Sequence, residues 1–234
     1  MSRIGIIGAM EVEVALLQAR MENRRQITKA GLDFYTGTLN GTEVVVVRSG
    51  IGKVNAALCA QRLIMEFGVT HMINTGIAGA TGKGLKVLDF VVSTDALYHD
   101  MDVTGFGYKL TEIPQMKVSD FPADKRLVEL AVAAFKSLPE ASGHDVTAGR
   151  IASGDQFIAD KVRKDHIKEI CSPACVEMEG AAIAHACFVN DVPFVVIRCM
   201  SDMADTGHEA VYDFNEKTAA ELSAGLVMEL LKKI

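Results

Sequence analysis

The chain has 234 residues, of which 49% are hydrophobic, and a formal net charge of −6 at pH 7. This length and apolar content predict one large globular domain over residues 1–234. The negative charge argues against a nucleic-acid-binding protein, and no apolar run is long enough to cross a membrane. Five cysteines without a Cys-x-x-Cys pair are predicted to be reduced, which favours a cytoplasmic protein.

Short apolar runs alternate with helical patterns along the chain. Strands are predicted at residues 3–8, 33–39, 43–49, 71–75, 89–93, 146–153 and 193–198. Helices are predicted at residues 11–21, 53–67, 125–138, 160–170, 178–190 and 213–233. Asn40-Gly41 between two strands is typical of a β-hairpin, so part of the sheet is expected to be antiparallel. The pattern predicts an α/β fold, a three-layer sandwich with a central mixed sheet flanked by helices.

Residues 98–121 follow neither a strand period nor a helix period. Irregular stretches longer than about 15 residues are uncommon unless they are functional or bound to a partner. We expect this aromatic segment to form a subunit interface, a pocket wall or both. A loop in solvent is the simpler alternative.

Acidic residues stand where predicted strands end. Glu11 and Glu13 follow the first strand, and Asp202 follows the last. Glu177 and Glu179 stand at the start of the fifth predicted helix. In open α/β folds ligands bind at the carboxyl ends of the strands, so these carboxylates are predicted to form one acid/base site.

Other motifs argue against several chemistries. Residues 5–8 lack the G-x-G-x-x-G spacing of a dinucleotide site, and residues 49–54 lack two positions of a P-loop. The pair Cys171 and Cys175 has no second ligand pair for zinc, so no metal site is expected. A covalent hydrolase is disfavoured because no nucleophile elbow is present.

Taken in order, several segments resemble the 5′-methylthioadenosine/S-adenosylhomocysteine nucleosidases of the nucleoside phosphorylase superfamily. The resemblance covers nearly the whole chain. Its matching segments are IGIIGAMEVE (4–13), SGIGKV (49–54), NTG (74–76), YHD (98–100), DVT (102–104), FGY (106–108), SGD (153–155), FI (157–158), VEME (176–179) and SD (201–202).

The resemblance implies hydrolysis of the bond between adenine and a 5′-thio-substituted ribose, without a cofactor or metal. It implies that Asp202 is the general acid that protonates the purine and that Ser201 orients it. Glu13 would activate the attacking water, which Arg198 helps to hold. From the residues alone, Asp202 could instead cap a turn, and Glu13 could be a first-turn glutamate that the helix dipole favours.

The resemblance also implies a substrate-binding set. Glu179 would bind the ribose hydroxyls and Phe157 would stack on adenine, with Ile158 at the purine edge. The other residues implied from the same subunit are Met10, Ile51, Ile77, Ala78, Gly79, Glu177, Met178 and Tyr212. The second subunit of a homodimer would contribute Val103, Phe106 and Pro114 from a loop at residues 103–114.

Two positions depart from the family pattern. The family's loop Gly-Ser-Ala-Gly is replaced here by Gly76-Ile77-Ala78-Gly79. The serine hydroxyl normally helps to hold the nucleophilic water, and one neutral hydrogen bond is worth roughly 0.5–1.5 kcal/mol, so we expect a weakened water site rather than an inactive enzyme. Tyr212 stands where relatives often have Phe, and its hydroxyl could admit a more polar 5′ group.

Three alternatives remain open. A purine nucleoside phosphorylase would use phosphate, but an anion about 4 Å from Glu13 would cost roughly 4 kcal/mol at an effective dielectric near 20. A hydrolase of another purine nucleoside, such as futalosine or 5′-deoxyadenosine, would keep Asp202. A non-catalytic nucleoside-binding module would have no need of a proton donor.

Overall fold

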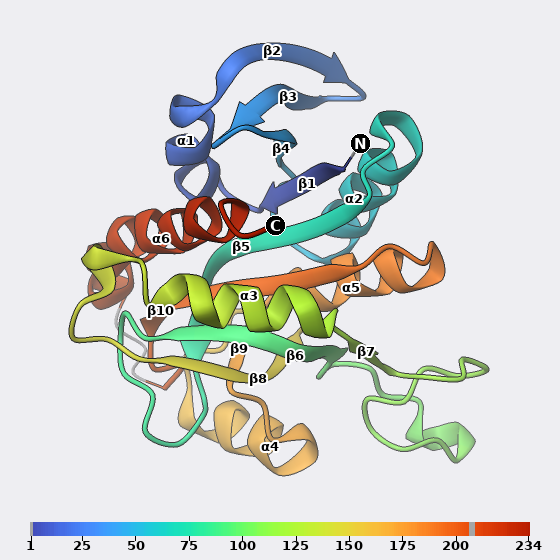
Figure 1. Cartoon of the computed structure of the whole chain (residues 1–234). Helices are drawn as coiled ribbons and strands as arrows, with labels where there is room; N and C mark the ends of the chain where they lie inside the picture. Colours follow the sequence, from blue (N-terminus) through green and yellow to red (C-terminus); the bar gives the residue numbers. More distant parts are fainter. Residues whose placement is uncertain (1, 206–208) are drawn as a thin grey trace.

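The computed structural model describes the backbone of residues 2–205 and 209–234, with side chains for 2–205 and 215–234 (Figure 1). The strands are β1 (Arg3–Gly8), β2 (Glu22–Lys29), β3 (Leu32–Leu39), β4 (Thr42–Arg48), β5 (His71–Ala80), β6 (Phe90–Tyr98), β7 (Asp120–Pro122), β8 (Val146–Ser153), β9 (Cys175–Glu177) and β10 (Phe194–Asp202). The helices are α1 (Glu11–Arg20), α2 (Lys53–Phe67), α3 (Lys125–Phe135), α4 (Lys161–Cys171), α5 (Gly180–Val189) and α6 (Glu209–Leu231). Across the residues described, none of these helices is long and apolar enough to cross a membrane.

The strands of the described chain form one mixed sheet. β1 pairs in parallel with β4 and β5, and β5 pairs in parallel with β10. Strands β5, β10, β6, β8 and β9 then pair in sequence back to β5, so this half of the sheet closes into a ring. The β3–β4 hairpin is antiparallel, and Asn40 and Gly41 at its turn have φ of 50° and 80°, which agrees with the predicted hairpin.

Helices cover both faces of the sheet (Figure 1). Successive side chains of β10 point to opposite faces of the sheet. Val195 and Ile197 pack in a core with α1, α3 and α6. Val196 joins the opposite core, which includes α2 and α5. This arrangement confirms the predicted three-layer α/β sandwich.

The main error of the sequence analysis is strand β2. Its sequence, ENRRQITK, is exposed at every position and has no apolar alternation, so the periodicity gives no signal. It pairs with β3 at the edge of the sheet, where charged residues are tolerated. The short strands β7 and β9 were also not predicted, and β5 runs five residues beyond its predicted end at Thr75 because its pairing with β10 continues to Gly79.

The segment at residues 98–121 is largely irregular, as predicted. Tyr98 ends β6, and the last two residues belong to β7. Between these strands, a stretch that the structure describes in full, the regular structure is a 3-10 turn, η1 (Thr104–Phe106). The segment thus leaves the sheet at β6 and returns to it at β7.

Candidate active site

A cavity of about 90 Å³ lies where β1, β5, β9 and β10 end. Glu13, Glu179 and Asp202 all line it, whereas Glu11, which was predicted to belong to the same site, does not. An adjoining space of about 30 Å³ adds Ile158 beside Phe157. The remaining predicted residues that line the main cavity are Met10, Ile51, Ile77, Ala78, Gly79, Phe157, Glu177, Met178 and Ser201.

A β-bulge in β10 positions Asp202. The pairing of β10 with β5 shifts between positions 200 and 202, so Ser201 is an additional residue. Bulges of this kind re-aim side chains next to active sites. The Ser201 hydroxyl donates to Asp202 Oδ2 at 2.8 Å, and the Ala204 amide donates to Oδ1 at 2.7 Å. The second bond is the turn-capping contact that the sequence also allows, and together the two bonds fix the carboxylate.

Glu13 is buried in the first turn of α1, and backbone amides hold its carboxylate. The amides of Ala9 and Met10 donate to Oε2 at 2.6 and 2.9 Å. The amide of Ile77 donates to Oε1 at 3.1 Å. Burial raises the pKa of Glu13, although Arg198 and these amides oppose the rise. Glu13 therefore binds a proton more readily than an exposed glutamate.

Two glycines of β5 allow the strand to approach the catalytic candidates. A Cβ atom at Gly76 would lie 2.4 Å from Glu13 Oε1 and 3.4 Å from Arg198 Nη1. A Cβ atom at Gly79 would lie 2.9 Å from Asp202 Oδ1. Side chains at these positions would displace the carboxylates, so glycine at both positions lets β5 lie close to Glu13 and Asp202.

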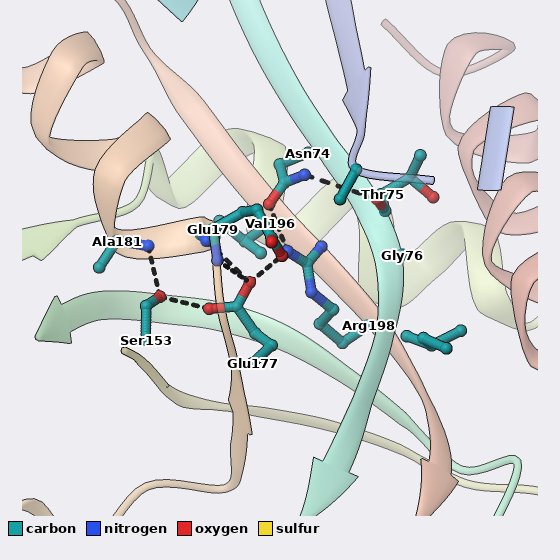
Figure 2. A network of polar contacts seen from close by, with 12 residues as sticks. Asn74, Thr75, Gly76, Ser153, Glu177, Glu179, Ala181, Val196 and Arg198 are labelled. Atoms are coloured by element: carbon teal, nitrogen blue, oxygen red, sulfur yellow. Dashed lines mark hydrogen bonds and ion pairs between the residues drawn. The ribbon is translucent and has the colours of Figure 1, made fainter. Parts of the chain in front are cut away.

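Protein donors occupy both oxygens of Glu177 (Figure 2). Oε2 accepts from Arg198 Nη2 at 2.5 Å and from the amides of Glu179 and Gly180 at 3.1 and 2.7 Å. Oε1 accepts from the Ser153 hydroxyl. These bonds hold the start of α5 in place. The hydrogen bonds of Glu177 in this structure therefore go to protein groups around the cavity.

Arg198 is buried and does not itself line the cavity. Figure 2 shows it beside Glu177 and Asn74. Its Nη2 also donates to Asn74 Oδ1 at 2.5 Å, and its Nη1 donates to the Ile197 carbonyl at 3.1 Å. Asn74 Nδ2 in turn donates to the Ile7 carbonyl of β1 at 2.9 Å. Sequence analysis assigned no role to Asn74, although a polar side chain inside an apolar strand is a signal that could have identified it.

Arg198 interacts with three buried carboxylates, Glu13, Glu177 and Glu179. Burial alone would lower the pKa of Arg198, but the carboxylates, Glu177 most strongly, raise it. Burial and the charge of Glu177 raise the pKa of Glu179 to about 8, against the opposing effect of a hydrogen bond from the Gly52 amide. Glu179 therefore releases its proton less readily than an exposed glutamate does.

Charged residues join the loops on two sides of the cavity. The Gly52 amide donates to Glu179 Oε1 at 2.7 Å, and the Lys53 amide donates to Asp155 Oδ1 at 2.8 Å. Lys53 Nζ donates to both oxygens of Asp100 at 2.7 and 2.6 Å. The start of α2 is thereby tied to residues 154–158, which carry the predicted adenine platform. Sequence analysis gave Lys53, Asp100 and Asp155 no role, although all three lie in its matching segments.

Comparison with known proteins matches residues 3–232 to the family model described as Phosphorylase superfamily. A 5′-methylthioadenosine/S-adenosylhomocysteine nucleosidase from Halalkalibacterium halodurans is 42% identical over the full length of both chains. The chain belongs to this nucleosidase family. The crystal structure of the Neisseria meningitidis nucleosidase in complex with methylthio-immucillin-A covers all of both chains at 41% identity, with a TM-score of 0.95. The futalosine hydrolase of Helicobacter pylori, at 31% identity, covers 100% of this chain and 98% of that one, with a TM-score of 0.93.

Besides Arg198, and Ile158 beside it, three of the residues that the resemblance implies do not line the cavity of the single chain. Val103, Phe106 and Pro114 lie on the irregular segment, and the Phe106 side chain is 86% exposed. Tyr212 lies outside the residues whose side chains are described.

Proposed function

We propose that this chain hydrolyses the N-glycosidic bond of 5′-methylthioadenosine and S-adenosylhomocysteine. The products are adenine and the 5′-thio-substituted ribose. The observation that carries the proposal is that Glu13, Glu179 and Asp202 line one cavity. The nucleosidase relatives, one of them bound to a methylthio-immucillin, support the same substrate class.

In the proposed reaction, Asp202 donates a proton to the imidazole-side nitrogen of the purine as the bond to ribose breaks. Protonation makes adenine a neutral leaving group, and positioned proton transfer typically contributes about 10²–10⁴ in rate. The hydroxyl of Ser201 orients the carboxyl group. Phe157 stacks on the adenine ring, and the Ile158 backbone meets the purine edge.

Glu13 is the proposed base for the attacking water. Its raised pKa moves it toward the working pH, where a general base is most effective. Arg198 is a positioning residue, because its positive charge opposes protonation of Glu13. Arg198 Nη1 and Glu13 Oε1 both lie close to Gly76 of β5. A water molecule held between Glu13 and Arg198 would attack the ribose carbon from which adenine departs, and Glu13 would take its proton.

The ribose and its 5′ group take up the rest of the cavity. The ribose hydroxyls donate to Glu179 in its ionised form, because charge-assisted hydrogen bonds are stronger than neutral ones. Met178 packs on the sugar ring. Met10 and Ile51 give an apolar wall for the thioether, with Ala78 and Gly79 beside the purine.

We propose that the chain functions as a homodimer. Apolar side chains of α2 and α5, two helices that pack together, are exposed on the single chain. Exposed apolar patches of this kind mark protein–protein interaction sites. The members of this patch are Val54, Leu58, Met65, Phe188 and Val189. In the dimer, the loop at residues 103–114 would bring Val103, Phe106 and Pro114 to the neighbouring cavity.

The dimer has a direct test. Sedimentation of the wild-type chain should give twice the chain mass, and Leu58→Glu should give the monomer. If the loop reaches the neighbouring site, Phe106→Ala should raise KM for methylthioadenosine while leaving the dimer intact. A wild-type chain that sediments as a monomer at micromolar concentration contradicts the proposal.

The reaction is tested with a panel of nucleosides. Methylthioadenosine, adenosylhomocysteine, futalosine and 5′-deoxyadenosine are incubated with the purified chain, with and without phosphate. We expect base release from the two thio-nucleosides at a rate that does not depend on phosphate. A product of ribose 1-phosphate type that forms only with added phosphate would identify a phosphorylase. Preference for futalosine would favour the activity named for the Helicobacter pylori futalosine hydrolase.

A further inference from the structure

A second and larger cavity, of about 440 Å³, adjoins the proposed active site. Ala9, Met10 and Ile51 are walls of both cavities. Residues at the start of β3 and the end of β4 form other walls of the outer cavity. A 5′ substituent that is too long for the inner cavity can therefore extend past Met10 and Ile51 into the outer one.

The walls of the outer cavity differ chemically from those of the inner one. The shared side is apolar, but Glu11, Asp33 and Arg48 bring charge to the outer cavity. Glu11 Oε2 and Arg48 Nη1 lie 3.8 Å apart, which is too far for a hydrogen bond between them, and the side chains are 60% and 58% exposed. Each group can thus turn toward a ligand without losing a close partner in this pair.

Asp33 is the most firmly held of the three charges. Its Oδ1 accepts from the Thr28 hydroxyl at 2.5 Å. This bond and one from Gln26 lower the pKa of Asp33, and the charge of Arg48 adds to the effect. The outer cavity therefore presents an ionised carboxylate and a guanidinium at neutral pH.

We propose that the outer cavity binds the zwitterionic amino-acid end of a 5′-thio substituent. Arg48 would pair with the α-carboxylate of the ligand, and Glu11 or Asp33 would pair with its α-ammonium group. A guanidinium suits this role because its planar donors match both oxygens of a carboxylate. The inference rests on the proposed function, since adenosylhomocysteine carries such a group beyond its sulfur atom. Methylthioadenosine ends in a methyl group, which stays in the inner cavity.

The difference between the two substrates gives the test. Steady-state kinetics are measured with both substrates for the wild-type chain and for Arg48→Gln. We expect kcat/KM for adenosylhomocysteine to fall about three- to tenfold, mainly through KM, as for loss of a partly exposed charged pair. For methylthioadenosine we expect less than about a twofold change, because its methyl group does not reach Arg48. Asp33→Asn should discriminate in the same direction.

A matched variant controls for the change in net charge. Arg25 lies on the exposed strand β2 and lines a different groove, so Arg25→Gln should leave both substrates unaffected. Equal effects of Arg48→Gln on the two substrates, or no effect on either, would overturn the outer site while leaving the nucleosidase function intact. If the wild-type chain turns over neither substrate, the proposed function fails and the outer site fails with it.

Discussion

Arg198 Nη2 lies 2.5 Å from Glu177 Oε2, with the two side chains only 2% and 3% exposed. We predict that Glu177→Gln lowers the free energy of unfolding by about 3–5 kcal/mol, because it removes the carboxylate that is bonded directly to the buried Arg198 charge. A glutamine also cannot accept from Ser153, Arg198 and the two amides together, since one of its two terminal groups is a donor. Urea unfolding monitored by circular dichroism measures the change.

An exposed pair provides the control for this prediction. Lys161 and Asp165 form an ion pair on the surface of α4. Exposed pairs contribute little because water screens them. Asp165→Asn should leave the urea midpoint within error of the wild-type value. Equal losses in the free energy of unfolding for the two substitutions would contradict the prediction, because they would show that the buried pair contributes no more than an exposed one.

The raised pKa of Glu179 predicts a dependence of stability on pH. This pKa rises from 4.5 to about 8 on folding, so the folded chain binds the proton more tightly than the unfolded chain does. The stabilising contribution of this group is complete below pH 4.5 and is lost as the pH rises toward 8. Glu179→Gln stays neutral, so its free energy of unfolding should rise relative to that of the wild type from pH 4.5 to 8. A difference that is constant with pH would refute the shift.

Gly76→Ala should inactivate the enzyme. The new Cβ atom would lie 2.4 Å from Glu13 Oε1, so Glu13 must move out of its amide bonds. Misplacement of a reacting group by about 1 Å can reduce the rate about a hundredfold, and we expect at least that loss in kcat. Gly225→Ala on α6 is the control, because among the described residues its Cβ atom would meet just the end of the Leu138 side chain, at 3.1 Å. It should keep full activity; similar activity in both variants would contradict the tight approach.

Ile77→Ser should improve catalysis. The Ile77 amide already holds Glu13, so the substitution adds a hydroxyl for the attacking water without removing that bond. One hydrogen bond of about 0.5–1.5 kcal/mol corresponds to a rise in kcat of roughly two- to tenfold. The buried isoleucine also packs in the core beside α1 and α6, so stability should fall by about 2 kcal/mol. Ile77→Val, which adds no hydroxyl, should not raise kcat.

The regular part of the fold could be predicted from the sequence because buried helices and strands leave characteristic runs and spacings of apolar residues. Strand β10 begins with a continuous apolar run, which is typical of a strand buried on both faces, and helix α3 repeats its apolar residues at helical spacing. Strand β2 is exposed throughout, so its position depends on pairing with β3 and leaves no pattern in its own residues. Propensity cannot reveal a strand that only its neighbour defines.

The members of the site were easier to predict than their contacts. Resemblance to the family identified Glu13, Glu179 and Asp202, which the structure brings to one cavity. The bonds of Glu177 to Arg198 and Ser153 join positions that are far apart in sequence, so no local pattern contains them. The outer cavity escaped prediction for the same reason, since it includes the turn between β2 and β3.

The most direct test of the proposed acid is the turnover of methylthioadenosine by Asp202→Asn. Asparagine keeps the size of the side chain and can still accept the Ala204 amide bond, but it has no acidic proton to donate. We predict that kcat falls by about 10³ or more, whereas the affinity for a non-hydrolysable analogue, measured by calorimetry, stays within about tenfold. Turnover close to that of the wild type would contradict the role of Asp202 as the proton donor.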